Sequence, residues 1–116
     1  MTKTILIVED MYGEFLEEII KRFGYCPILY SNGNEAFSDV RDKIVKYDLA
    51  FIDLSLPGCG GDQVIEISKE VYPSVPVICI SGYKTQSTKA DQHIVKPFEP
   101  SFLRQIISGY ISQELK

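Results

Sequence analysis

Apolar residues follow two alternating patterns along the chain: short continuous runs, and longer stretches in which they recur at helical spacing. The continuous runs are rich in β-branched residues, which is typical of strands buried on both faces of a sheet. They predict strands at residues 5–8, 27–30, 49–52, 75–80 and 94–95. The helical spacing predicts helices at residues 12–23, 34–45, 62–71 and 100–115. The apolar face of the second predicted helix comprises Ala36, Phe37, Val40 and Ile44.

The regular alternation of strands and helices predicts the α/β class, with a parallel sheet covered by helices on both faces. Right-handed crossovers make such a sheet doubly wound. Pro27 lacks a backbone N–H, which favours an edge position for the second strand. With 116 residues and no linker-like segment, we expect residues 1–116 to form one domain, with no output domain in this chain.

Charge and composition exclude several classes of function. The net charge of −4 and the sequence pI near 4.9 argue against nucleic-acid binding, which needs clustered Lys and Arg. No apolar run is long enough to span a membrane, and no signal-peptide pattern precedes the first strand. Three cysteines without CxxC spacing are typical of reduced thiols. We therefore expect a cytoplasmic protein without nucleic-acid or membrane partners.

Polar residues directly follow the predicted strands, where open α/β sheets bind their ligands. Glu9 and Asp10 follow the first strand, Asp53 the third, Ser81 the fourth and Lys96 the fifth. Three carboxylates would repel one another without a cation between them, and a few carboxylates plus water suit octahedral Mg²⁺. A carboxylate flanked by Mg²⁺, an ammonium group and a hydroxyl can attack phosphorus and become an acyl phosphate.

Each of these residues alone has an ordinary structural explanation. Glu9 and Asp10 could balance the dipole of a following helix, and Asp53 could be a turn residue. Ser81 begins a common loop dipeptide, and Lys96 could be a surface lysine before a turn. Their complementary chemistry at successive strand ends favours one shared site.

Four segments of the chain resemble the receiver domains of two-component response regulators. They are Ile5–Asp10 with its acidic pair, Asp53–Gly61 with its proline and glycines, Ile80–Gly82, and Ala90–Phe98 with its lysine-proline pair. The resemblance implies a flavodoxin-like, five-stranded parallel sheet in the order 2-1-3-4-5. It also implies a phosphorylation-dependent signalling switch.

The resemblance assigns roles to the acidic residues. Asp53 would be the phosphoacceptor, charged by the phosphohistidine of a histidine kinase or a phosphotransfer protein. Asp10 and Asp53 would bind Mg²⁺ directly, Glu9 would act through water, and the Ser55 backbone carbonyl would be a further ligand. Such a protein is not an enzyme with an outside substrate. It catalyses its own phosphoryl transfer, and whether it also catalyses its own dephosphorylation stays open.

The resemblance also names the residues that respond to the phosphoryl group. Lys96 would hold the phosphoryl oxygens, and Ser81 would move towards them on activation. The position three residues before the lysine carries Tyr or Phe in that family, and its ring moves together with the serine. This chain has His93 there, its only histidine. Whether His93 switches or simply faces solvent is open at this point.

The segment at residues 83–88 departs from the family pattern. The family has a whole helix there, but these six residues are polar and poor helix formers. We expect the fourth helix of the family to be missing or reduced to a turn. Because that helix belongs to the family's output and dimer face, we expect an unknown downstream protein to read the switch through a non-standard surface. We expect a monomer or a weak dimer.

Other classes of protein remain as alternatives. A receiver fold that never uses phosphate would be a protein-interaction module; the complete set of site residues argues against it, and the expected loss of a helix argues for it. An aspartate-nucleophile phosphatase of the haloacid-dehalogenase type would need a second acid two residues after the nucleophile, where this chain has Ser55. A flavin carrier would need a Ser/Thr-rich phosphate loop after the first strand, where Glu9 and Asp10 would repel phosphate.

Overall fold

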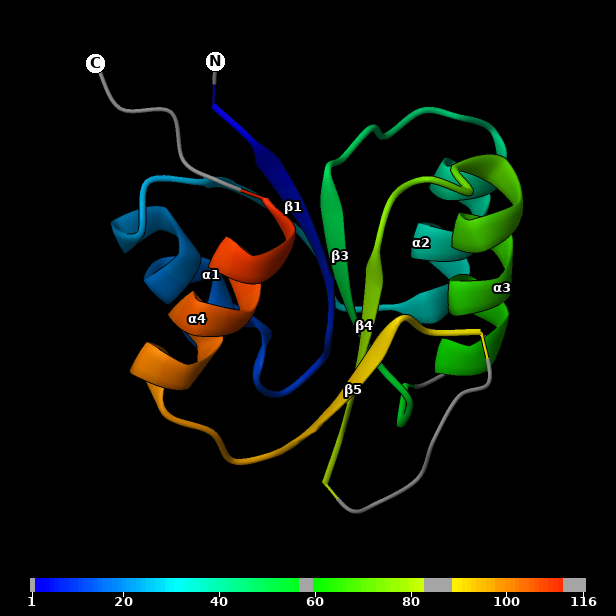
Figure 1. Ribbon diagram of the computed structural model, residues 1–116. Coiled ribbons are helices and arrows are strands. Elements are labelled where there is room, and N and C mark those ends of the chain that lie inside the picture. Colours follow the sequence, from blue (N-terminus) through cyan, green and yellow to red (C-terminus); the bar gives the residue numbers. More distant parts are fainter. Residues whose placement is uncertain (1, 57–59, 83–88, 112–116) are drawn as a thin grey trace.

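The five strands form one parallel sheet with helices on both faces (Figure 1). The computed structural model describes residues 2–56, 60–82 and 89–111. Its strands are β1 (Thr4–Val8), β2 (Cys26–Tyr30), β3 (Leu49–Asp53), β4 (Val77–Ser81) and β5 (Gln92–Val95). Its helices are α1 (Gly13–Arg22), α2 (Gly33–Arg41), α3 (Gly61–Val71) and α4 (Pro100–Tyr110). The sheet order β2-β1-β3-β4-β5 confirms the predicted fold class.

Two separate apolar cores lie on the two faces of the sheet. Along β1, Leu6 and Val8 face the core beneath α2 and α3, whereas Ile5 and Ile7 face the core beneath α1 and α4. The central strands β1, β3 and β4 are buried on both faces, which explains their continuous apolar runs. The helices therefore hold the central strands from both sides, and the polar residues at the strand ends project from a rigid base. The strand with Pro27 lies at the sheet edge, as predicted.

The second helix is shorter than predicted, and Ile44 does not face inward. Helix α2 ends at Arg41, and Lys43 adopts a left-handed conformation with φ 58°. The Ile44 N–H then donates to the Asp39 carbonyl at 2.8 Å, which closes a Schellman-type turn. This turn redirects the chain, so that Ile44 is 69% exposed and Val45 is buried in its place.

The last helix also ends earlier than predicted. Helix α4 stops at Tyr110, and Ile111 has extended backbone angles. The remainder of the predicted helix, residues 112–116, lies outside the described residues. No helix in the described part of the chain has the length and apolar character needed to cross a membrane.

The connection between β4 and β5 is anchored by Asp91. Its carboxylate accepts the Val77 N–H at 2.7 Å and the Lys69 ammonium at 2.9 Å, which ties the connection to the start of β4 and to α3. The described residues of this connection, Gly82 and residues 89–91, are not helical. Residues 83–88, where we predicted the missing or shortened helix, lie outside the described residues.

Candidate functional site

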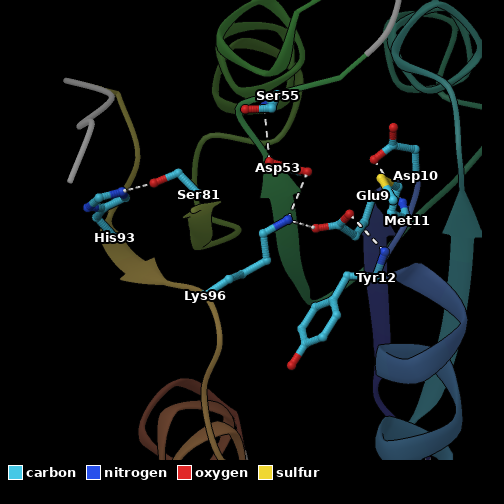
Figure 2. A network of polar contacts seen from close by, with 9 residues as sticks. All are labelled: Glu9, Asp10, Met11, Tyr12, Asp53, Ser55, Ser81, His93 and Lys96. Carbon is cyan, nitrogen blue, oxygen red and sulfur yellow. Dashed lines mark hydrogen bonds and ion pairs between the residues drawn. The ribbon is translucent and has the colours of Figure 1, made fainter. Parts of the chain in front are cut away.

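The predicted site residues lie at the carboxyl edge of the sheet because parallel strands end on the same side. Asp53 is the last residue of β3, and Ser81 is the last residue of β4. Glu9 directly follows β1, where its N–H donates to the Tyr30 carbonyl at 3.0 Å, and Lys96 directly follows β5. Residues from four strands, far apart in the sequence, are thus brought to one edge (Figure 2).

Three carboxylates meet at this carboxyl edge of the sheet. Glu9, Asp10 and Asp53 each offer an oxygen, and these oxygens lie within 4.8 Å of one another. Glu9 is fully buried and Asp53 is 1% exposed, whereas Asp10 is exposed at the rim. The predicted cluster of acids is therefore present, with two of its members out of contact with bulk water.

Lys96 provides the positive charge that faces the buried acids. Its ammonium nitrogen lies 2.9 Å from Glu9 Oε2 and 3.3 Å from Asp53 Oδ2 (Figure 2). The Lys96 side chain is 23% exposed, so it reaches the acids from the solvent side. The Lys96–Pro97 peptide is cis.

Burial and neighbouring charges shift two pKa values at the site. Burial raises the pKa of the Glu9 carboxyl, although its hydrogen bonds with Lys96 and the Tyr12 N–H act in the opposite direction. Burial alone would lower the pKa of Lys96, but the interactions with Glu9 and Asp53 outweigh it and the pKa is raised. Three carboxylates face one ammonium group at this edge. The surplus of negative charge and the set of oxygen donors fit a hard divalent cation such as Mg²⁺.

The loop after β3 holds the Asp53 carboxylate in place. Asp53 Oδ1 accepts the Ser55 N–H at 3.0 Å, and the Leu54 N–H donates to the Ile80 carbonyl at 2.9 Å. Gly61, the first residue of α3, lies against the backbone of Asp53 and Leu54 so closely that a Cβ atom would be 2.7 Å from Leu54 Cα. This position requires glycine. Residues 57–59 of the loop lie outside the described residues.

Tyr12 was not expected at the site from the sequence. Its backbone N–H donates to Glu9 Oε1 at 3.1 Å, and its ring centroid lies 5.7 Å from the Lys96 ammonium. The ring also packs edge-on against Phe98, with 5.6 Å between centroids. Tyr12 is the N-cap residue of α1, and Glu9 lies three residues before it; neither the backbone contact nor the ring contact follows from a pattern in the sequence.

Ser81 is placed differently from the other predicted residues. Its hydroxyl oxygen lies 3.0 Å from His93 Nε2, and in Figure 2 the Ser81 side chain points towards His93 and away from Asp53. Ser81 is 1% exposed, and His93 is half-buried on the neighbouring strand. The structure therefore brings together Glu9, Asp10, Asp53 and Lys96 and leaves the Ser81 hydroxyl directed elsewhere.

Comparisons with known proteins agree with this geometry. The family model of the response regulator receiver domain matches residues 5–108. The transcriptional regulatory protein YbdJ of Bacillus subtilis is 36% identical over 83% of this chain, and the match covers 45% of YbdJ. Sporulation initiation phosphotransferase F of the same organism is 28% identical over 96% of this chain and 95% of its own length. The chain thus spans about half the length of one relative and nearly all of the other.

A solved structure gives the same result for the fold. The response regulator protein TrrA from Thermotoga maritima, in complex with Mg²⁺-BeF, superposes with a TM-score of 0.85. It is 26% identical to this chain, and the alignment covers 95% of this chain and all of that one.

Proposed function

Because the chain belongs to the response regulator receiver family of two-component systems, we propose that Asp53 accepts a phosphoryl group from a phosphohistidine of a partner protein. The donor would be a histidine kinase or a phosphotransfer protein. Receiver domains are signalling domains, so the reaction changes the state of the protein itself. One observation carries the proposal: the carboxylates of Glu9, Asp10 and Asp53 meet one another at the carboxyl edge of the sheet, where the Lys96 ammonium contacts Glu9 and Asp53.

The transfer step follows from the contacts of the Asp53 carboxylate. Oδ1 accepts the Ser55 N–H, and Oδ2 accepts the Lys96 ammonium. Oδ2, the oxygen beside the positive charge, would be the attacking atom. Oδ2 forms the new O–P bond while the N–P bond of the donor breaks, and the electron pair of that bond stays on the imidazole nitrogen. Lys96, now 3.3 Å from Oδ2, stabilises the negative charge of the phosphoryl oxygens during the transfer.

The acidic cluster would hold Mg²⁺. Asp10 and Asp53 would coordinate it directly, with the Ser55 carbonyl as a further ligand. Glu9, whose oxygens accept hydrogen bonds from Tyr12 and Lys96, would act through water. Bound Mg²⁺ would neutralise the charge of the phosphoryl oxygens in the transition state. A downstream protein would read the phosphorylated state through a surface that does not depend on the family's fourth helix.

Intact-mass measurement with a small acyl phosphate donor tests the proposal. In the presence of Mg²⁺, the wild-type protein should gain one phosphoryl group, and removal of Mg²⁺ by a chelator should abolish the gain. Asp53→Asn should abolish it too. Asp62→Asn, which changes an exposed acid in the first turn of α3, should leave it intact. A folded wild-type protein that gains no phosphoryl group would refute the proposal and favour a phosphate-independent interaction module.

A further inference from the structure

The register of β4 and β5 brings His93 next to Ser81 on one face of the sheet. His93 pairs with Cys79, and Ser81 pairs with Val95. Cys79 belongs to the core beneath α2 and α3, whereas Ile94 belongs to the core on the opposite face. Because side chains alternate along a strand, Ser81 and His93 both lie on the face of Cys79. The two residues are diagonal neighbours there, and the histidine ring is long enough to span the gap.

The hydrogen bond between these side chains competes with the site. Ser81 has a single side-chain torsion with a small number of staggered positions, and its present rotamer directs the hydroxyl to His93 Nε2 at 3.0 Å. Figure 2 shows that this direction is away from Asp53. The hydroxyl therefore has to rotate before it can reach a group bound to Asp53.

We infer that His93 is a positioning residue, which holds the Ser81 hydroxyl away from Asp53 until a phosphoryl group draws it over. The inference rests on the proposed function of Asp53 as phosphoacceptor. A phosphoryl group on Asp53 gains Ser81 as a donor only when the hydrogen bond to His93 breaks. The hydrogen bond with His93 thus stabilises the unphosphorylated state and sets a threshold for the switch.

The chemistry of the pair makes this restraint robust. A serine hydroxyl can donate or accept, so it can bond to Nε2 in either tautomer of the neutral ring and also to the charged ring. A phenylalanine at position 93 would keep a ring of similar size but would offer no hydrogen-bonding atom. A glutamine would keep a polar group at about the distance of Nε2. These two replacements separate the hydrogen bond from the packing of the ring.

Equilibrium binding of beryllofluoride, a mimic of the phosphoryl group, tests the inference. The full chain is titrated with beryllofluoride in the presence of Mg²⁺, and binding is followed by fluorine NMR. His93→Phe should bind roughly two- to tenfold more tightly than wild type, which corresponds to the loss of one part-buried hydrogen bond from the free state. His93→Gln should bind with wild-type affinity. In the Ser81→Ala background, His93→Phe should change nothing, because the bond that it removes is already absent.

Two outcomes would overturn the inference: an unchanged affinity for His93→Phe, or the same change with and without Ser81→Ala, which would indicate an effect of packing alone. Far-UV circular dichroism checks the fold of each variant, and His93→Leu replaces His93→Phe if the latter does not fold. If the wild-type protein itself fails to bind beryllofluoride and gains no phosphoryl group from an acyl phosphate, the proposed function has failed. If the wild-type protein binds beryllofluoride and His93→Phe binds it with the same affinity, only the proposed role of His93 is refuted.

Discussion

Replacing Lys96 by methionine should destabilise the protein in the absence of divalent cations. Lys96 forms ion pairs with Glu9 and Asp53. These two acidic residues are 0% and 1% exposed. Removing one partner of a buried ion pair costs about 3–5 kcal/mol. Lys96 is 23% exposed, and Glu9 can take up a proton because its pKa is already raised. We therefore expect a smaller loss, about 2–3 kcal/mol near neutral pH.

Urea unfolding with a chelator present, followed by circular dichroism, measures this loss. Lys69→Met is the matched control, since Lys69 pairs with Asp91, which is 38% exposed, and should cost about 1 kcal/mol or less. The loss in Lys96→Met should also depend on pH. An acid whose pKa is raised by folding is best tolerated when protonated, so the variant should lose stability relative to wild type as the pH rises above the ordinary carboxyl value of 4.5.

Mg²⁺ gives a second, independent measure of the same charge imbalance. A ligand that binds only the folded state stabilises it, and the cation would replace the missing ammonium charge. Added Mg²⁺ should therefore stabilise Lys96→Met more than wild type. A Lys96→Met variant as stable as wild type with the chelator present would refute the reasoning, because the buried carboxylates would then not depend on Lys96.

Four further substitutions test the surroundings of the site, the helices and the core by chemical denaturation. Gly61→Ala would force a Cβ to 2.7 Å from Leu54 Cα and should cost about 2–3 kcal/mol. A Cβ added at Gly109 would meet no atom within 4 Å outside its chain neighbours and the backbone of its own helix. Gly109→Ala should therefore be neutral or stabilise α4 by up to about 1 kcal/mol. Asn32→Ala removes the side-chain cap of α2, which accepts two backbone N–H groups, and should cost about 1 kcal/mol. Burial raises the pKa of Tyr47 from 10.0 to about 12. The contribution of neutral Tyr47 to the free energy of unfolding is therefore complete below pH 10 and is lost as the pH rises towards 12. This pH-dependent loss of stability should reach about 3 kcal/mol. It should be smaller in the Tyr47→Phe variant.

The strands were predicted well because their environment leaves a simple trace in the sequence. The β4 residues from Val77 to Ile80 are apolar since both faces of that strand are covered. Helix ends were predicted less well. Lys43 adopts a left-handed conformation although it is not a glycine, so nothing in the sequence indicated that the helix ends there. The helical spacing of apolar residues appeared to continue to Ile44. The end of α4 at Tyr110 likewise has no proline or glycine directly after it.

The site could be predicted as far as strand ends determine it. The parallel arrangement alone brings Glu9, Asp53 and Lys96 to one edge, so their convergence followed from the fold class. The ring of Tyr12 over Lys96 and the bond between Ser81 and His93 depend on side-chain rotamers and strand register. Neither the rotamers nor the register can be read from the sequence, and both contacts join residues on different elements.

The ion pair between Glu9 and Lys96 joins residues 87 positions apart, which bears on how the chain folds during its synthesis. The ribosome releases the N-terminal part first, so β1 and β3 with their acidic ends, and β4, are exposed before β5 and Lys96 have been made. Until then the buried carboxylates lack their counter-charge, and the sheet also lacks its last strand and the α4 layer. We expect the nascent chain to acquire its stable fold late, once Lys96 has left the ribosome. The lysine that we propose to act in phosphoryl transfer is thus also one of the last residues needed for the protein to hold together.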